Sequence, residues 1–339
     1  MANPTSRTIS YTSVLAATLE DRAPGFIDQV EKQIPLWWWL KSHNRYRAAG
    51  GEAITWSVRN QLQQSEASYA GFEVSGLQET DEFTTLLANW KQYRMPIIIS
   101  GLDLNVKNRG KKVFDLYDAR EQAALNGLQE QLGEHLYLDG TGNSSKRVTG
   151  LAALCPEDPT TGTLFNVNRA TAGNEYWRSQ IVDHAGAAAH ASGVLSMRRG
   201  MEELRILCGR GKAGGNGRRY PDVAFCTEGY LRNYSDMLST QQRFQNTMAA
   251  DNGFTTLTFD GMTLMEDQDC PLDAESEDQA YFINSDFVEL RYAAAQNFLS
   301  VPPEKPIDQD GFVAWILWAG ELTLQNANKQ GLHFGIAVI

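Results

Sequence analysis

A glycine-rich segment is the first place in this sequence where phosphate chemistry could reside. Residues 209–214 read Gly-Arg-Gly-Lys-Ala-Gly and match the GxGxxG pattern of dinucleotide-binding loops. That chemistry needs a strand before the glycines and a helix after them, so that the helix amino terminus faces the pyrophosphate. Here the preceding residues have helical periodicity, and Pro221 disfavours a helix after the glycines. The P-loop pattern fails as well, because Gly215-Asn216 occupy the positions of its Lys-Ser/Thr. The segment 209–219 is therefore interpreted as a mobile basic surface loop, whose cationic residues are Arg210, Lys212, Arg218 and Arg219.

Three other patterns could carry catalytic or metal chemistry, and each one is incomplete. The acidic stretch from Glu266 to Asp273 begins like a calcium loop, but Pro271 and Leu272 stand where an EF-hand needs Asp or Asn and then Gly. It is interpreted as a solvated acidic loop. The histidines form neither an HExxH motif nor a His-x3-His pair, and there is no GxSxG elbow. The sequence therefore predicts no catalytic residue, no metal site and no cofactor, although a soluble enzyme of unrecognised class stays open as an alternative.

The composition is that of an ordinary globular protein. The chain has 339 residues, of which 42% are hydrophobic and 21% charged. No apolar stretch approaches the roughly 18 residues of a membrane helix, and the amino terminus lacks a secretory pattern, which predicts a soluble intracellular product. The net charge of −11 argues against a dedicated nucleic-acid binder. The four cysteines are far apart and contain no CxxC pair, so buried thiols are expected.

Hydrophobic periodicity predicts a mixture of helices and strands. Ile54, Trp56 and Val58 alternate with polar residues, which indicates a half-exposed strand. Residues 83–99 are rich in β-branched and aromatic side chains and indicate a second strand, in which Pro96 disfavours a central position. Because a long polar stretch separates the two strands, they resemble an extended hairpin arm that is not stable alone.

A long amphipathic helix is expected over residues 112–138, followed by turn residues. Shorter helices are expected within residues 10–33, 194–207 and 228–244. Further strands are expected at residues 221–226, 255–259, 262–265, 281–283, 287–292, 312–318 and 332–338. Since helices and strands mix without a steady βαβ rhythm, the fold class is α+β.

Several motifs, in order along the chain, resemble the major capsid proteins of tailed bacteriophages. They are Gly150-Leu151-Ala152-Ala153-Leu154, Asn168-Arg169, Tyr176-Trp177-Arg178-Ser179, Pro221-Asp222-Val223-Ala224-Phe225, Phe259-Asp260-Gly261-Met262, Asp269-Cys270-Pro271 and Tyr281-Phe282-Ile283-Asn284. Each motif is weakly specific by itself, and the resemblance rests on their order along the chain. Two features depart from the family pattern, namely the aromatic run Trp37-Trp38-Trp39 and the long insert at 209–219.

The resemblance implies the HK97-like capsid fold. Its parts would be an N-terminal arm (1–50), an extended β-hairpin loop or E-loop (51–100), the spine helix with the first part of the peripheral domain (101–149), an axial domain (150–258), and return strands that are largely peripheral (259–339). It also implies self-assembly into hexamers and pentamers of an icosahedral phage head that encloses double-stranded DNA. An encapsulin-type compartment with the same fold is the first alternative.

Aromatic residues are the expected inter-subunit contacts, because aromatics are enriched where interfaces lose water. The candidates are Trp37, Trp38 and Trp39 in the arm, and Trp56, Tyr69, Phe72 and Trp90 in the loop. For Trp56 and Trp90 an intramolecular core position is an equal alternative. A thin arm is expected to leave at least one of its three indole rings for a neighbouring subunit.

The expected partners follow from the resemblance. They are other copies of the chain, a separate scaffolding protein, a portal, a decoration protein and, by proximity, the packaged DNA; no membrane is involved. The arm starts near Ser10, which leaves no room for a fused scaffold, so no long segment is expected to be removed during maturation. The expected location is the virion, after assembly in the cytoplasm of an infected bacterium.

Overall fold

The structure is a computed structural model that describes residues 34–60, 71–72, 82–102, 111–184, 196–210, 220–238, 256–306 and 310–337, with the backbone alone for residues 111–116. Its contacts divide the chain into two compact units. The described residues of the smaller unit are 93–102, 111–129, 298–306 and 310–317, and those of the larger unit are 34–60, 71–72, 82–92, 130–184, 196–210, 220–238, 256–297 and 318–337.

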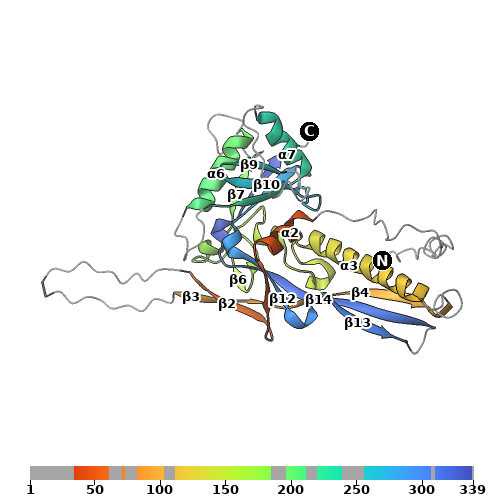
Figure 1. Ribbon diagram of the computed structural model, residues 1–339. Coiled ribbons are helices and arrows are strands. Elements are labelled where there is room, and N and C mark those ends of the chain that lie inside the picture. Colours follow the sequence, from red (N-terminus) through yellow and green to blue (C-terminus); the bar gives the residue numbers. More distant parts are fainter. Residues whose placement is uncertain are drawn as a thin grey trace. The chain divides into compact units, whose positions relative to one another are not determined.

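Helices and strands are mixed along the whole described chain (Figure 1). The helices are α2 (Pro35–Ser42), α3 (Lys111–His135), α4 (Gly142–Ser145), α5 (Leu151–Leu154), α6 (Met197–Gly209) and α7 (Glu228–Met237). The strands are β1 (Tyr46–Ala49), β2 (Ile54–Arg59), β3 (Phe83–Ala88), β4 (Lys91–Ser100), β5 (Thr163–Leu164), β6 (Val167–Asn168), β7 (Gln180–Asp183), β8 (Val223–Cys226), β9 (Thr256–Phe259), β10 (Met262–Glu266), β11 (Asp278–Ile283), β12 (Val288–Ala293), β13 (Leu299–Glu304), β14 (Gly311–Leu324) and β15 (Gly331–Ile336).

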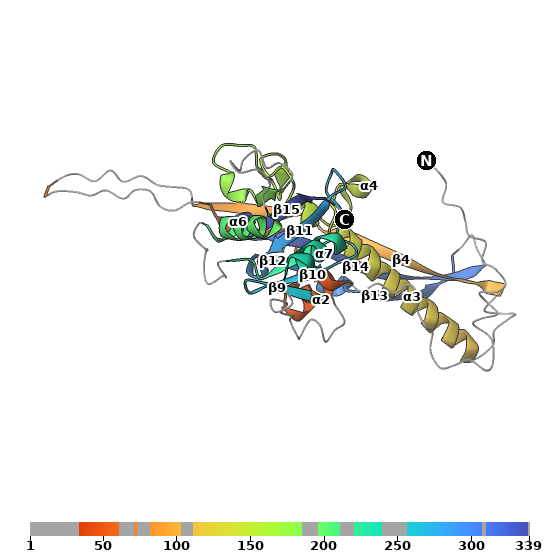
Figure 2. The same cartoon turned by 90° about the horizontal axis from the view of Figure 1, so that it is seen from above.

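The smaller unit is a helix on a sheet. Residues 311–317 of β14 pair with β13 in antiparallel register, and β4 also pairs with β14. Helix α3 lies along β4, where the Arg120 guanidinium donates to the Ile98 carbonyl (Figure 2). Among the described strands β4 pairs only with β14, so Pro96 lies on an edge strand, as its missing N–H requires.

The larger unit is built around a six-stranded sheet in the order β7-β15-β11-β8-β10-β9. Every residue of the inner strand β8 is buried, which explains why it reads as a continuous apolar run rather than as an alternation. Helices α6 and α7 cover one face, and their apolar sides form a single core with the alternate residues Ala224, Cys226 and Phe282 of the sheet (Figure 1). The opposite face presents Phe225 and Tyr281.

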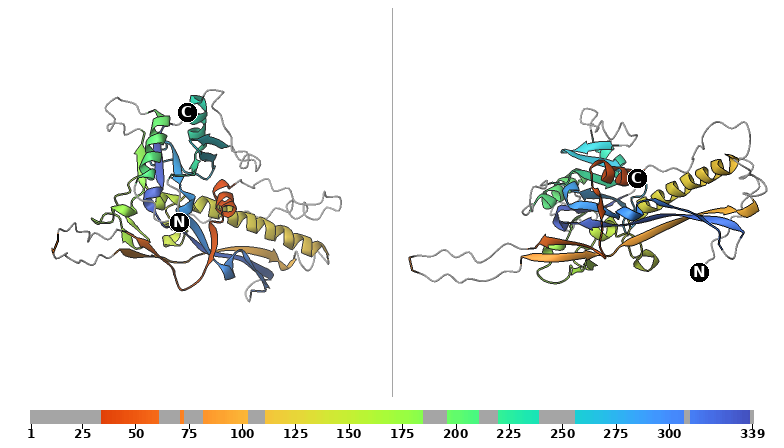
Figure 3. Two further views of the ribbon diagram at one scale, coloured as in Figure 1. Left: turned by 60° about the vertical axis from the view of Figure 1, so that its left-hand side comes forward. Right: turned by 60° about the horizontal axis from the view of Figure 1, so that its bottom comes forward.

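Three further groups of paired strands complete the larger unit, one of which is the two-stranded sheet of β5 and β6. Strand β1 pairs in parallel with β12, and β12 pairs antiparallel with residues 320–324 of β14. Strands β2 and β3 form an antiparallel ladder of six residue pairs, and they lie side by side in every view (Figure 3).

The structure confirms most of the expected elements, because they depend on local periodicity. The helix expected at 112–138 is α3, the half-exposed strand at 54 is β2, and the buried strand at 221–226 is β8. All four cysteines are buried free thiols, as expected. The helices expected within 10–33 lie outside the described residues.

The sheet of the larger unit crosses the linear division of the chain that the resemblance implies. Strands β10, β11 and β15, which lie after residue 258, pair in one sheet with β7 and β8, which lie before it. The reason is that strand pairing joins residues that are far apart in sequence, for example Leu332 with Ile181, and a linear division of the chain cannot represent it. The assignment of these segments to an axial and a peripheral domain stays a prediction.

Candidate functional site

The β2–β3 hairpin has one covered face and one open face. Because side chains alternate along a strand, the facing pairs Ile54–Ala88 and Trp56–Leu86 lie on one face, and Thr55–Leu87 and Arg59–Phe83 on the other. Ile54, Leu86 and Ala88 are buried. Phe83 is 64% exposed and Leu87 is 41% exposed, so the open face carries two large apolar side chains.

Trp56 anchors the covered face to the rest of the larger unit. Its indole nitrogen donates to the Leu324 carbonyl over 3.0 Å, and its ring meets Phe165 edge to face with 5.1 Å between centroids. The Arg291 guanidinium lies 5.6 Å from the same ring. Phe165 has a φ of 49°, an unfavourable value for an aromatic residue, and it shares a tight turn with Asn166 between β5 and β6. The ring of Trp56 therefore packs within its own chain, which was the alternative left open for it.

The other loop candidates differ in their surroundings. Trp90 is half-buried, and its indole nitrogen donates to the Gly51 carbonyl over 2.9 Å, which closes the base of the hairpin. Phe72 is fully exposed. Tyr69 lies outside the described residues. Phe83 and Leu87 were not among the candidates from sequence, because their face follows from the register between β3 and β2, and the apolar residues within 83–88 do not alternate with polar ones.

The three tryptophans of the arm lie on helix α2, and two of them are buried in their own chain. Trp37 is 6% exposed and packs against Tyr46 and Trp318, with ring centroids 5.3 and 6.4 Å away. Trp39 is 3% exposed and meets Phe225, on the sheet face opposite α6 and α7, at 5.7 Å. Trp38 is half-buried.

Trp37 and Trp39 are therefore used within the chain, and the expectation that at least one of the three rings is left for a neighbouring subunit now concerns Trp38 alone. The physical reason is that the segment is a helix seated on strands, not a thin extended strand. The helix carries Trp37 to Tyr46 of β1 and Trp318 of β14, and Trp39 to Phe225 of β8, so the two rings pack against strands of two different sheets. An inter-subunit role from this segment rests on Trp38.

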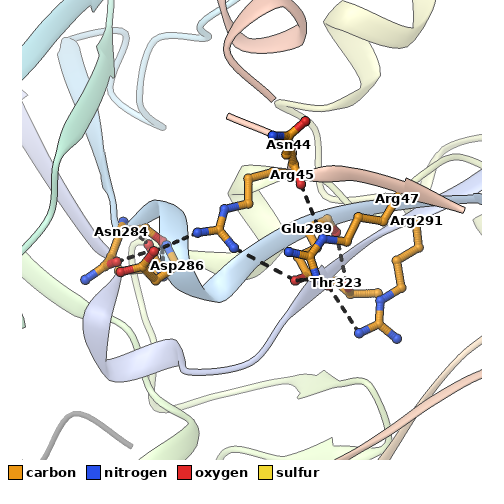
Figure 4. Close-up of polar contacts among 9 residues, drawn as sticks. Asn44, Arg45, Arg47, Asn284, Asp286, Glu289, Arg291 and Thr323 are labelled. Carbon is orange, nitrogen blue, oxygen red and sulfur yellow. Dashed lines mark hydrogen bonds and ion pairs between the residues drawn. The ribbon is translucent and has the colours of Figure 1, made fainter. Parts of the chain in front are cut away.

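Strand β1 is held to β12 by a cluster of charged residues (Figure 4). The buried Glu289 carboxylate lies 3.2 Å from Arg47 and 3.3 Å from Arg291, and Arg45 reaches Asp286 over 2.6 Å. Backbone pairing runs alongside, because the Leu290 N–H donates to the Arg45 carbonyl over 2.8 Å. We call the five charged residues the arm clamp; they are Arg45, Arg47, Asp286, Glu289 and Arg291. No sequence motif indicated it, because its partners are about 240 positions apart.

The acidic stretch after β10 is not simply solvated, which corrects the interpretation from sequence. Asp267 is 1% exposed and accepts three hydrogen bonds, from the Tyr137 hydroxyl (2.7 Å), the Leu36 N–H (3.3 Å) and the Asp269 N–H (3.0 Å). Burial raises the pKa of its carboxyl to about 6, although these hydrogen bonds oppose the rise. The stretch therefore contributes one carboxylate to the interior of the larger unit.

The basic loop is described only at its first residue. Helix α6 ends at Gly209, so the helix that the sequence placed before the glycines is present and a nucleotide-binding strand is not. Arg210 is exposed, and its carbonyl accepts from the buried Lys329 ammonium over 3.0 Å. Lys212, Arg218 and Arg219 lie outside the described residues. The mobility expected for this loop therefore stays a prediction.

A cavity of about 430 Å³ in the larger unit is lined by Tyr137, Cys155, Glu157, Gln279 and Tyr281, among others. Its polar groups have structural partners: Glu157 accepts from the Ala274 N–H, and Gln279 donates to the Pro271 carbonyl. Burial raises the pKa of the Cys155 thiol to about 12, so the reactive thiolate is scarce at neutral pH. Nothing in this lining resembles a nucleophile with its base.

The described part of the chain contains neither a metal-binding cluster nor a membrane-spanning helix. There, no group of three or more His, Cys, Asp or Glu side chains is placed to hold a metal ion. Nor does any helix in it combine the length and apolar character needed to cross a membrane.

Comparison with known proteins gives a likeness of structure without a likeness of sequence. No family model and no curated protein matches the chain. The capsid asymmetric unit of cyanophage A-1(L) matches with a TM-score of 0.62 at 15% identity, over 94% of this chain and 97% of that one. The capsid asymmetric unit of cyanophage Pam1 matches with a TM-score of 0.55 at 12% identity, over 99% and 100%. The holo-SrpI encapsulin complex of Synechococcus elongatus PCC 7942 matches with a TM-score of 0.54 at 10% identity, over 95% of each chain. The chain therefore has the HK97-like α+β fold of these shell proteins.

Proposed function

We propose that this chain is the major capsid protein of a tailed bacteriophage, a structural subunit that assembles into an icosahedral head around double-stranded DNA. The observation that carries the proposal is the end-to-end likeness to phage capsid subunits, which covers 94–99% of the chain in the phage matches above.

The geometry of the hairpin supports assembly as its function. A two-stranded ladder has little core of its own, and here one face is already used by the Trp56 anchor. Phe83 and Leu87 remain on the open face, where their exposure forgoes hydrophobic burial. A neighbouring copy that covers this face would form a heterologous contact, which closes into rings when the rotation between copies closes.

A stable protein interface buries about 800 Å² per partner, so two side chains can anchor such a contact but not supply all of it. Trp38 and Phe72 remain proposed contacts, and Trp90 is proposed as a support at the base of the hairpin. Under this proposal the partners are other copies of the chain, with a scaffolding protein, a portal and a decoration protein as further partners. The particle would form in the cytoplasm of the infected host, and no enzymatic step would be required of the subunit.

An encapsulin-type compartment is the second candidate, and the match to the SrpI encapsulin complex favours it specifically. Both candidates share the fold and the self-association. They differ in the contents of the particle, which are nucleic acid in one case and cargo protein in the other.

Self-assembly of the purified chain, followed by the contents of native particles, tests the proposal. The full-length chain is purified at several concentrations and examined by sedimentation velocity and by electron microscopy. Shells, or rings that convert to shells, are expected; a stable monomer or small oligomer at every concentration would refute both candidates. Nuclease-protected DNA inside particles from the native source supports the phage head, whereas a stoichiometric second protein without DNA supports the compartment.

A further inference from the structure

We propose that Asp267 makes the seating of helix α2 dependent on pH, so that the arm segment is held more firmly in acid than at neutral pH. The inference concerns regulation of the chain and does not depend on the proposed function. It rests on a buried carboxylate at the junction of three segments: helix α2, the end of helix α3 and the turn after β10.

Asp267 caps helix α2 from a distant part of the chain. The N-cap position of α2 is Ile34, whose side chain cannot accept a hydrogen bond, and Pro35 follows it. The Leu36 N–H is one of the donors that a helix leaves without a partner in its first turn. Asp267, 231 residues away in sequence, accepts from it instead. A negative charge at this end also interacts favourably with the helix dipole.

The start of α2 is seated closely on the end of α3. A Cβ added at Gly133 would lie 2.7 Å from the Ile34 side chain, so only a glycine allows this approach. The Tyr137 hydroxyl, one helical turn further along the chain, donates to the same carboxylate oxygen as Leu36. If α2 leaves this position, the Asp267 carboxylate loses one donor and the cover that keeps water away.

The ionised carboxylate is in an unfavourable place despite its hydrogen bonds. The titratable groups that face it are Tyr137 from the turn after α3, Asp269 and Cys270 from its own turn, and Cys226 from β8, all of which are neutral or negative. None of its described contacts is with a cationic side chain. Desolvation therefore dominates and raises the pKa of Asp267 from 3.8 to about 6.

The direction of the pH effect follows from linkage. The seated state has the higher pKa, so it binds the proton more tightly than a released state in which Asp267 meets water. Acid therefore favours seating, and this stabilisation is lost as the pH rises through about 6. With the released pKa at its ordinary value of 3.8, the seating equilibrium should change about tenfold between pH 8 and pH 5, with a limit of about 160-fold at low pH.

Hydrogen exchange of the α2 amides measures this equilibrium directly. The full-length chain is exchanged at pH 5 and pH 8, and the rates for residues 36–42 are corrected with unstructured-peptide rates. The wild type should show about tenfold higher protection of α2 at pH 5 than at pH 8. Asp267→Asn, which resembles the protonated acid, should abolish this difference. Glu321→Gln is the matched control, because Glu321 is a second buried carboxylate with a pKa raised to about 7, and it bonds to Thr149 rather than to α2.

Tyr137→Phe provides a second measurement in case the Asn variant does not fold. It removes one hydrogen bond to the carboxylate, so the pKa of Asp267 should rise and the change in α2 protection should move to higher pH. Equal wild-type protection at the two pH values would overturn the proposal. So would a wild-type difference that persists in Asp267→Asn, or a Tyr137→Phe profile that does not move. These hydrogen-exchange measurements do not require an assembled shell, so a negative result for Asp267 is distinguishable from a failure of the capsid proposal.

Discussion

Replacing Trp39 by Ala should release helix α2 from the larger unit without unfolding the rest of the chain. Trp39 is 3% exposed, and its ring packs edge to face against Phe225, which is itself fully buried in β8. Truncating a buried tryptophan typically costs about 3–5 kcal/mol, because the apolar contact is lost and a cavity remains. Since each 1.4 kcal/mol corresponds to a factor of ten, the seating equilibrium of α2 should fall by about 100-fold or more.

Trp38→Ala is the matched control, because Trp38 lies on the same helix, has the same size and is half-buried. Its loss should change the seating equilibrium much less, by an amount typical of surface substitutions. Hydrogen exchange of residues 36–42 is the assay, with strand β8 as the internal reference for global stability. Equal loss of α2 protection in the two variants, or wild-type protection in Trp39→Ala, would refute the assignment of Trp39 to the core of the chain.

Three further predictions concern the hairpin, the arm clamp and a second buried carboxylate. Phe83→Ser combined with Leu87→Ser should leave the circular dichroism spectrum unchanged and raise the protein concentration needed for assembly. Thr85→Ala, on the same face, should leave that concentration unchanged. Assembly of the double variant at the wild-type concentration in sedimentation would argue against a contact on this face. Glu289→Gln should cost about 2 kcal/mol, because it removes the buried carboxylate that Arg47 and the partly buried Arg45 and Arg291 share, whereas Arg47→Ala, at a side chain that is more than half exposed, should cost less than about 1 kcal/mol; equal shifts in thermal unfolding would contradict this. Burial raises the pKa of Glu321 from 4.5 to about 7, so its stabilising contribution is present below pH 4.5 and is lost as the pH rises through 7. Glu321→Gln should therefore be more thermally stable than the wild type at pH 8 but not at pH 4.5. A gain of equal size at both pH values would count against this assignment.

The elements that could be predicted from sequence are those whose signal is local. The alternation from Ile54 to Val58 gave both the strand and its covered face, and the 3.6-residue period gave helix α3. Strand β13 was missed because Pro302 and Pro303 argue against a strand. Prolines are tolerated at a sheet edge, and β13 pairs only with β14 among the described strands. Whether a strand lies at an edge is a property of the whole sheet, which the local sequence does not contain.

The functional features that sequence reasoning missed depend on partners that are distant in the chain. Asp267 stands among other acidic residues, so a solvated loop was the natural interpretation. Its burial follows from Tyr137 and from helix α2, which lie 130 and 231 positions away. The arm clamp has the same character, because Arg45 and Glu289 carry no motif. Apolar pattern predicts which faces are covered, but it does not predict what covers them.

The burial of Trp37 and Trp39 also changes where an assembly contact is to be sought. An aromatic side chain contributes to association only if its surface is free before the partner arrives, and these two rings are already used within the chain. The hairpin presents the opposite case, because Trp56 fixes one face and leaves Phe83 and Leu87 open on the other. A hairpin anchored in this way is pre-organised, so a partner would not have to order the two described strands on binding. We therefore expect substitutions on the open face of the hairpin to weaken association between subunits, and substitutions in the aromatic core of the arm to weaken the subunit itself.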